Sequence, residues 1–367
     1  MPNNKDLVGK RGWFKGTGEE GDVILSSRVR LARNLTDYPF PNSLGSEQEA
    51  KVQGEIISAF NRLPIGDKFT ILYLRDLSPV DRRILLERNI ITHDFSLAKD
   101  KAVILSKDET ISLMINEEDH IRLACIIEGM SLDRAFEKLD RIDTLLEEHI
   151  HFAISLEWGY LNSSLTDIGT GMRTSIMIHL PALVMTSLIE KALKAVTQVG
   201  LSVKGFFGEG INSLGDIYQI SNQVSLGLSE YAIIKSLASV VTPLINYERK
   251  TRDELLNKRR AEIEDKVFRA FGILSSCRRI SSREAIELLS NLRLGISLGI
   301  IDNVPLGTVN TLFFHCQKSH IQKLLQGLDE PINSPADTRN IDFLRARIIR
   351  ESLLDEENVG GRKCLKD

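Results

Sequence analysis

Hydrophobic residues recur at two spacings along the chain, and each spacing predicts a different kind of element. After Ser131, apolar residues three and four positions apart predict a helix that extends to about Ile150. Capping signals predict further helix starts at Ser46 and Ser78, and a proline and a glycine bracket a helix over residues 181–200. Shorter apolar runs predict strands over residues 69–74, 102–105, 110–115, 151–156, 175–180, 201–207 and 216–220.

Several of these strands follow one another directly, without a helix between them. This order favours a mixed or largely antiparallel sheet with helices packed on it, and it disfavours a doubly wound parallel sheet. The first two thirds of the chain is therefore predicted to be an α+β unit.

The pattern becomes purely helical from about Ser229 onward. Pro243 predicts a kink or a break, and further helices are expected over residues 251–271, after Ser281 and over residues 337–354. The chain is thus expected to have an all-helical C-terminal domain. The expected parts are an N-terminal segment (1–20), an α+β catalytic domain (21–250), the helical domain (251–358) and a disordered tail (359–367).

The composition is that of an ordinary globular protein and does not indicate a particular function. The chain has 367 residues, 42% of them hydrophobic, and a formal net charge of −3, which gives no reason to expect a nucleic-acid or membrane partner. There is no apolar run of spanning length and no signal-peptide core, so we expect a cytoplasmic protein. The four cysteines are scattered and form no Cys-x-x-Cys pair, which predicts reduced, structural thiols.

Basic residues alternate in the segment that follows the apolar run 22–25. Strand alternation would place Arg28 and Arg30 on one face, about 7 Å apart. Two guanidinium groups on a rigid element suit a polyphosphate, because each can bind phosphate oxygens bidentately. The alternative is a solvated basic strand at the edge of a sheet.

Acidic residues cluster in the segment 116–122. Glu118 and Arg122 are four positions apart, so they would share a face on a helical turn. The cluster could bind a cation, either a metal ion or an organic cation, or it could be a solvated turn.

Two glycine-containing loops also carry charged residues. One loop ends at Arg173 after Gly169 and Gly171, and the other begins at Lys204 and continues through Gly208 and Glu209. Backbone N–H groups beside a basic side chain can hold phosphate, although ordinary turns have the same composition. Together, the basic and acidic segments predict a nucleoside triphosphate on one side of a site and a cationic substrate on the other.

Three motifs resemble the phosphagen (ATP:guanido) kinase family in order and spacing. They are Ser-Ser-Arg-Val-Arg-Leu-Ala-Arg-Asn from Ser26, Asn-Glu-Glu-Asp-His-Ile-Arg from Asn116, and Gly-Thr-Gly-Met-Arg-Thr-Ser from Gly169. The resemblance covers roughly residues 20–355, and the helical C-terminal third is similar to that of the bacterial protein-arginine kinases of the McsB type. It implies transfer of the γ-phosphoryl group of ATP, with Mg²⁺, to arginine side chains in proteins.

The resemblance also implies which residues form the site. Glu118 would pair with the acceptor guanidinium. The ATP-binding residues would be Ser27, Arg28, Val29, Arg30, Leu31, Arg122, Arg173, Thr174, Ser175, Lys204, Gly205, Gly208 and Glu209.

Several positions depart from the family pattern. Lys204 replaces an arginine, and Asn89 stands where a nucleotide-contacting histidine is common. On the acceptor side, Asn212 replaces a second carboxylate and Ser164 replaces a cysteine. These changes leave two alternatives to an active protein-arginine kinase, namely a pseudokinase that binds without efficient transfer and a kinase for a small guanidino compound.

The C-terminal domain of McsB-type kinases carries an Arg-Asp-x-x-Arg-Ala motif that binds phosphoarginine. Asp342 and Arg345 match it here, whereas Ile341 replaces its leading arginine. The resemblance further implies a zinc-finger activator, a protease-chaperone and a heat-shock repressor as partners, and a homodimer formed through the helical domain.

Overall fold

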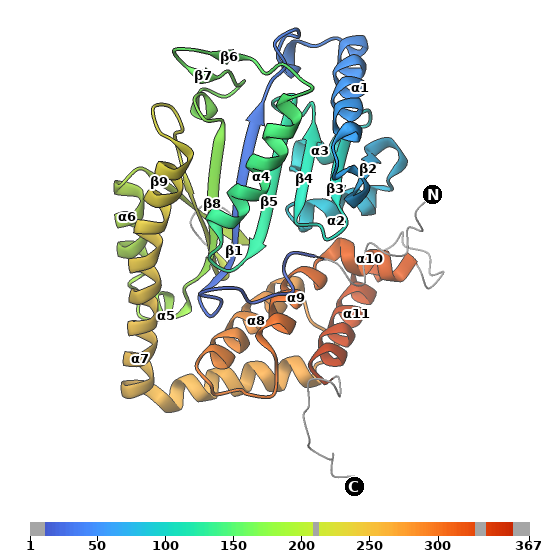
Figure 1. Ribbon diagram of the computed structural model, residues 1–367. Helices are drawn as coiled ribbons and strands as arrows, with labels where there is room; N and C mark the ends of the chain where they lie inside the picture. Colours follow the sequence, from blue (N-terminus) through green and yellow to red (C-terminus); the bar gives the residue numbers. More distant parts are fainter. Residues whose placement is uncertain (1–11, 208–212, 327–334, 355–367) are drawn as a thin grey trace.

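The computed structural model describes residues 12–207, 213–326 and 335–354 of the chain. At its centre is an eight-stranded sheet whose neighbouring strands pair antiparallel, in the order β2–β3–β4–β5–β1–β8–β10–β9 (Figure 1). The strands are β1 Ile24–Arg33, β2 Phe69–Tyr73, β3 Ala102–Ser106, β4 Ile111–Ile115, β5 Ile121–Glu128, β8 Met172–His179, β9 Leu201–Phe207 and β10 Leu214–Asn222. A separate hairpin consists of β6 Ile154–Ser155 and β7 Gly159–Tyr160.

Helices pack on this sheet and then form a separate layer near the C-terminus (Figure 1). The predicted fold class, an antiparallel α+β unit followed by a helical region, is confirmed. The helices are α1 Ser46–Arg62, α2 Pro79–Glu87, α3 His93–Leu97, α4 Leu132–Glu147, α5 Pro181–Met185, α6 Ile189–Gln198, α7 Glu230–Ser276, α8 Ser282–Ser297, α9 Leu306–His315, α10 Lys318–Gln326 and α11 Pro335–Leu354.

The two faces of the sheet have different coverings. On one face, alternate residues of β1 such as Val29 and Leu31 are buried in a core with α1, α4 and the first part of α7. On the other face, α2 and α3 pack over β3 and β4, and the C-terminal helices pack over residues such as Ile126 and Met177. The face between these coverings carries Arg28 and Arg30 of β1, Arg122 of β5 and Arg173 of β8.

A buried polar network attaches the helical region to the sheet. The fully buried Arg293 of α8 donates hydrogen bonds to the backbone oxygens of Gly21 (2.7 Å) and Asp22 (2.9 Å), just before β1. Its guanidinium also contacts His179 at the end of β8. Burial and the positive charges of Arg293 and Arg252 hold the pKa of His179 well below its usual value, so this imidazole is neutral.

Several predicted helix boundaries are confirmed by their caps. The Ser78 hydroxyl accepts from the N–H of Asp81 at 3.1 Å, and the Ser281 hydroxyl accepts from that of Glu284 at 3.2 Å. In α1 the cap is Gly45, one residue before the predicted Ser46.

Other element predictions are wrong. The helix expected over residues 181–200 is divided into α5 and α6 around Ser187, whose φ is +58°. The helix α7 continues through Pro243, where a break was one of the expected outcomes, and its non-helical backbone lies at Arg259. The sharp bend of α7 is visible in Figure 1. This helix therefore runs through the predicted domain boundary at residue 250.

Within the described residues, no helix combines the length and apolarity needed to cross a bilayer. Cys125, Cys277 and Cys316 are free thiols, and burial raises the pKa of Cys125 to about 12, as expected for a structural cysteine. Cys364 and the tail 359–367, for which disorder is predicted, lie outside the described residues.

Candidate active site

Arg28 and Arg30 lie on an interior strand of the sheet. β1 pairs with β5 on one side and β8 on the other, so the alternative of a solvated strand edge is wrong. In the β1–β8 register, Arg30 is directly opposite Arg173, and Arg28 is opposite Ser175. Directly opposed residues point to the same face, which places two basic side chains side by side.

The same register brings the other predicted basic residues to this face. Arg122 of β5 is opposite Ala32, two residues along β1 from Arg30. Lys204 is opposite Gln219 on the edge strand β9 and is exposed. We call the face that carries Arg28, Arg30, Arg122, Arg173 and Lys204 the arginine face.

Two of these arginines have deeply buried Nε atoms. The Nε atoms of Arg28 and Arg30 are inaccessible to solvent and have no hydrogen-bond partner among the described residues. Burial, followed by the charge of Arg122, lowers the pKa of Arg28 to about 10. Burial and neighbouring arginines hold the pKa of Arg30 well below its usual value. Such groups favour a bound anion that brings its own charge and acceptors.

The acidic segment is the tight connection between β4 and β5, not a helical turn. Its carboxylates nevertheless reach Arg122, because Glu117 accepts a hydrogen bond from Arg122 Nη1 and Glu118 lies 3.1 Å from the same atom. Asp119 is fully buried and accepts from Asn34 Nδ2 at 2.7 Å and from the Ser163 N–H at 2.8 Å. The alternative of a solvated turn is therefore wrong.

Of the two carboxylates in this turn that bond Arg122, Glu118 is the more exposed. Its side chain is 43% exposed, against 11% for Glu117. Burial raises the pKa of Glu118 above its usual value, and the carboxylates of Asp119 and Glu117 add to this effect against the opposing charge of Arg122. A carboxylate that is exposed, oriented and more basic than usual can bind a guanidinium and accept a proton from it.

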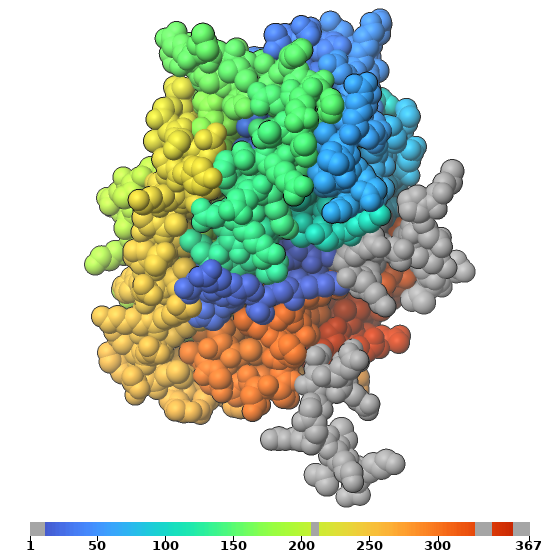
Figure 2. All heavy atoms as spheres, viewed as in Figure 1, coloured from blue at the N-terminus to red at the C-terminus, as the bar shows by residue number. Residues whose placement is uncertain are grey.

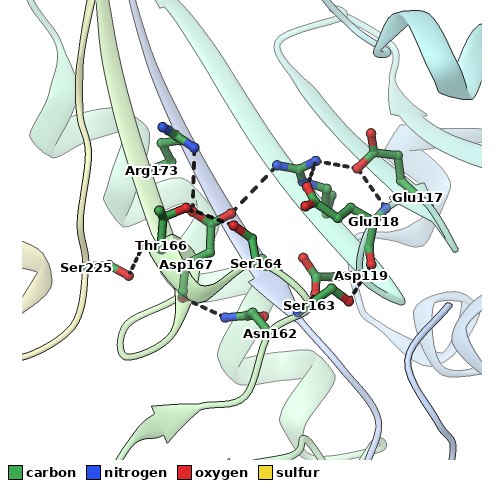
Figure 3. A network of polar contacts seen from close by, with 12 residues as sticks. Glu117, Glu118, Asp119, Asn162, Ser163, Ser164, Thr166, Asp167, Arg173 and Ser225 are labelled. Carbon is green, nitrogen blue, oxygen red and sulfur yellow. Dashed lines mark hydrogen bonds and ion pairs between the residues drawn. The ribbon is translucent and has the colours of Figure 1, made fainter. Parts of the chain in front are cut away.

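The loop that precedes β8 lies beside the acidic turn, as Figure 3 shows, and Ser163 of this loop bonds both Asp119 and the backbone of Glu118. Ser164 begins its short 3-10 turn, and the Ser164 hydroxyl lies 2.8 Å from that of Thr166. Sequence reasoning missed Asp167, whose carboxylate lies 3.9 Å from Arg122 and 3.7 Å from Arg173. Its position in the sequence, between Ser164 and the glycine loop, could have indicated that Asp167 belongs to the site.

The glycine loop allows this close approach. Gly171 has a φ of +64°, and a Cβ atom there would lie 2.5 Å from the backbone oxygen of Ala32. Only glycine therefore lets the loop contact β1 next to the arginines.

Several residues predicted to bind ATP have side chains that do not lie on the arginine face. Val29 and Leu31 belong to the core under α4. Ser27 is also buried, and its hydroxyl donates to the Gly129 oxygen at 2.8 Å. Thr174 is buried against Asn222. Because strand side chains alternate, these four cannot contact a ligand on the arginine face through their side chains, and the predicted contacts would have to come from their backbone groups.

Asn89 lies beside the arginine face. It lines a small crevice together with Arg28, Ser175 and the aromatic residues Trp13 and Phe206, neither of which was predicted. Gly205 lies in β9 opposite Tyr218. The predicted site residues Gly208, Glu209 and Asn212 lie outside the described residues.

Asp342 and Arg345 form a pair within the helical region. Arg345 is buried and donates to the backbone oxygens of Cys316 (2.8 Å) and Ile280 (2.9 Å) as well as to Asp342. Ile341 is buried against Ile321 and other apolar residues. Arg345 is thus largely committed to internal contacts.

Comparisons with known proteins agree with this geometry. A family model described as ATP:guanido phosphotransferase, C-terminal catalytic domain, matches residues 51–251. A second model, described as the protein-arginine kinase McsB C-terminal domain, matches residues 260–362. The protein-arginine kinase of Halothermothrix orenii is 44% identical over 94% of this chain and 99% of its own length. That of Geobacillus stearothermophilus is 42% identical over 93% of each chain.

Two solved structures have a similar fold. The duplicated taurocyamine kinase from Schistosoma mansoni, with bound transition-state analogue components, matches with a TM-score of 0.55 and 26% identity. The match covers 68% of this chain but only 36% of that one. Lombricine kinase matches with a TM-score of 0.56 and 23% identity, over 66% of this chain and 70% of that one, and supports the fold alone. From the family models and the full-length relatives, the chain belongs to the ATP:guanido phosphotransferase family, among the protein-arginine kinases.

Proposed function

We propose that this protein transfers the γ-phosphoryl group of ATP to a guanidinium nitrogen of arginine side chains in other proteins. The observation that carries the proposal is the arginine face, where the buried Nε atoms of Arg28 and Arg30 lack hydrogen-bond partners among the described residues and a partly exposed carboxylate, Glu118, lies nearby. The cations suit a triphosphate, and the carboxylate suits a cationic acceptor. Membership of the protein-arginine kinases supports a protein acceptor.

On the nucleotide side, we propose that Arg28, Arg30, Arg122 and Arg173 hold the phosphate oxygens and neutralise charge during transfer. Phosphoryl transfer depends mainly on positioning and charge stabilisation, which fixed guanidinium groups supply. Lys204 would add a more mobile charge from the edge strand, without the planar donor pair of an arginine.

Mg²⁺ is proposed to enter bound to ATP. Among the described residues, no three His, Cys, Asp or Glu side chains are placed to hold a metal ion. Mg²⁺ in such reactions binds mainly phosphate oxygens and water, with one or two carboxylates. It would therefore arrive as part of the substrate and neutralise phosphate charge beside the arginines.

On the acceptor side, we propose that Glu118 orients the guanidinium and takes its proton. The guanidinium is a poor nucleophile while fully protonated. As the acceptor N–H proton passes to Glu118, the nitrogen–phosphorus bond forms and the bond from the γ-phosphorus to the bridging oxygen breaks. ADP leaves, and the product is a phosphoarginine side chain. Ser164 and Asn212 would contribute hydrogen bonds here but no negative charge.

Further partners are proposed from family membership alone. They are a zinc-finger activator, a protease-chaperone, and a second copy of the chain bound through the helical region. By the same reasoning we place the protein in the cytoplasm, where ATP and protein substrates are available, and assign phosphoarginine binding to Asp342 and Arg345.

The test uses purified protein with Mg²⁺-ATP and either an arginine-rich protein or free arginine. Phosphorus NMR would detect an acid-labile N-phosphate. We expect transfer to the protein and none to free arginine. Transfer to free arginine would instead indicate a small-molecule kinase, and nucleotide binding without transfer to either would indicate a pseudokinase.

A further inference from the structure

We propose that Asp167 is a positioning residue, a built-in counter-ion that holds Arg122 and Arg173 together and competes with phosphate for them. The inference rests on the proposed function, since it assigns the arginine face to the nucleotide. It concerns a residue that neither the motifs nor the resemblance singled out.

The geometry begins with the separation of the two arginines. Arg122 and Arg173 lie on β5 and β8, with β1 between them, so their backbones are about 10 Å apart across the sheet. The Asp167 carboxylate nevertheless lies 3.9 Å from Arg122 Nη2 and 3.7 Å from Arg173 Nη1. Figure 3 shows the Asp167 carboxylate on the side of its loop that faces Arg173. One anion thus connects cations from two strands.

A third arginine shares this anion. Arg30 lies opposite Arg173 on the strand between the two. Burial and three neighbouring arginines lower the pKa of Arg30, and the Asp167 carboxylate opposes them. The Asp167 side chain is only 6% exposed, so water screens these interactions weakly.

The loop fixes the carboxylate in place. The Asp167 N–H donates to the backbone oxygen of Ser164 at 3.0 Å, and the backbone oxygen of Asp167 accepts from Asn162 Nδ2 at 2.7 Å. From the other side, the Ser225 hydroxyl donates to the backbone oxygens of Thr166 and Ile168. A carboxylate held by both flanks of its loop keeps the arginines at a set position before nucleotide binds.

Two consequences of opposite sign follow. Replacing Asp167 with a neutral residue removes one negative charge from the arginine face, so a phosphate anion meets more uncompensated cations and binds more tightly. The same change frees Arg122 and Arg173 to settle on the bound phosphates in other geometries, so transfer slows. A purely structural residue would instead weaken both binding and catalysis when removed.

The test compares wild type with Asp167→Asn. We expect the dissociation constant for Mg²⁺-ADP, measured by calorimetry, to fall about tenfold, and kcat for protein-arginine phosphorylation to fall about tenfold. Asp167→Glu restores the charge and should return both values toward wild type. Glu157→Gln is the matched control, because it removes one exposed carboxylate from the β6–β7 turn and should change neither value.

Unchanged or weaker ADP binding by a folded Asp167→Asn variant would overturn the inference. If that variant does not fold, Asp167→Ser, with a smaller neutral side chain, is measured in its place against the same expectation. A wild-type protein that binds no Mg²⁺-ADP would overturn the proposed function as well, whereas normal wild-type binding without tightening in the variant overturns this inference alone.

Discussion

Arg30 and Arg173 lie directly opposite each other on adjacent strands, which places two cations side by side on one face of the central sheet. Like charges in this arrangement repel each other, and burial of Arg30 adds a desolvation cost. We therefore expect this pair to lower the stability of the fold unless an anion binds between the two side chains.

Replacing Arg30 with methionine should therefore separate activity from stability. We expect loss of phosphorylation, because a phosphate ligand is gone, together with an unchanged or higher melting temperature. Replacing buried charged groups with apolar side chains is often neutral or stabilising by roughly 1–4 kcal/mol, and Arg30 is also repelled by three neighbouring arginines. Thermal unfolding followed by circular dichroism, alongside an activity assay, measures both effects.

Arg33 on the same strand is the matched control. It points to the opposite face, pairs with Asp143 at 2.7 Å and packs on the Tyr160 ring. Arg33→Met leaves the Asp143 carboxylate buried and unpaired, so we expect a loss of about 3–5 kcal/mol. Equal destabilisation by the two substitutions would contradict this account of the arginine face.

Glu118→Gln should remove the proton acceptor while leaving nucleotide binding largely intact. We expect kcat to fall by about 10²–10⁴ and the dissociation constant for ATP to change little. In wild type, activity should rise with pH through the Glu118 pKa, which burial holds above its usual value, because only the carboxylate form accepts the proton. The variant should lack this acidic limb. A retained limb would assign the proton acceptor elsewhere.

Asn212→Glu should restore the second acceptor-side carboxylate that the family resemblance implies. We expect the rate of phosphoarginine formation to rise about tenfold, because a second negative charge helps to bind and deprotonate the guanidinium. Asn212→Gln, which adds length without charge, is the control. No gain with Glu would mean that the missing carboxylate does not limit this enzyme.

Asp216 predicts a pH dependence of stability. Burial raises its pKa from 3.8 to about 6, so the folded protein favours the neutral acid more than the unfolded chain does. The contribution of this group to the free energy of unfolding should thus be highest below about pH 4. It should fall by about 3 kcal/mol as pH rises through 6. Asp216→Asn should abolish this decrease in urea titrations, since asparagine tolerates the local φ of +56°.

Local patterns predicted the parts of the site that depend on one strand or one turn. Alternation was enough to place Arg28 and Arg30 on one face, and spacing was enough to pair Glu118 with Arg122, although the connection proved not to be helical. The strand β5 was missed, because its interior position makes Ile121–Glu128 a nearly continuous buried run without alternation.

The remaining contacts depend on residues far apart in the chain. Asp167 lies close to Arg122 because the tertiary fold brings the loop before β8 next to β5. The spacing of hydrophobic and polar residues along the chain cannot predict such a contact. The interruption between α5 and α6 occurs at Ser187 without glycine or proline to mark it. In α7, tertiary packing overrides the expected effect of Pro243, and the helix continues.

The hydrogen bonds of Arg293 to Gly21 and Asp22 also constrain the order of events during synthesis. The carbonyls just before β1 leave the ribosome some 270 residues ahead of their partner, since synthesis proceeds from the N-terminus. The segment that leads into β1, with Arg28 and Arg30, therefore lacks these hydrogen-bond partners until α8 has been translated. A nascent catalytic half is thus a candidate client for chaperones during its own production.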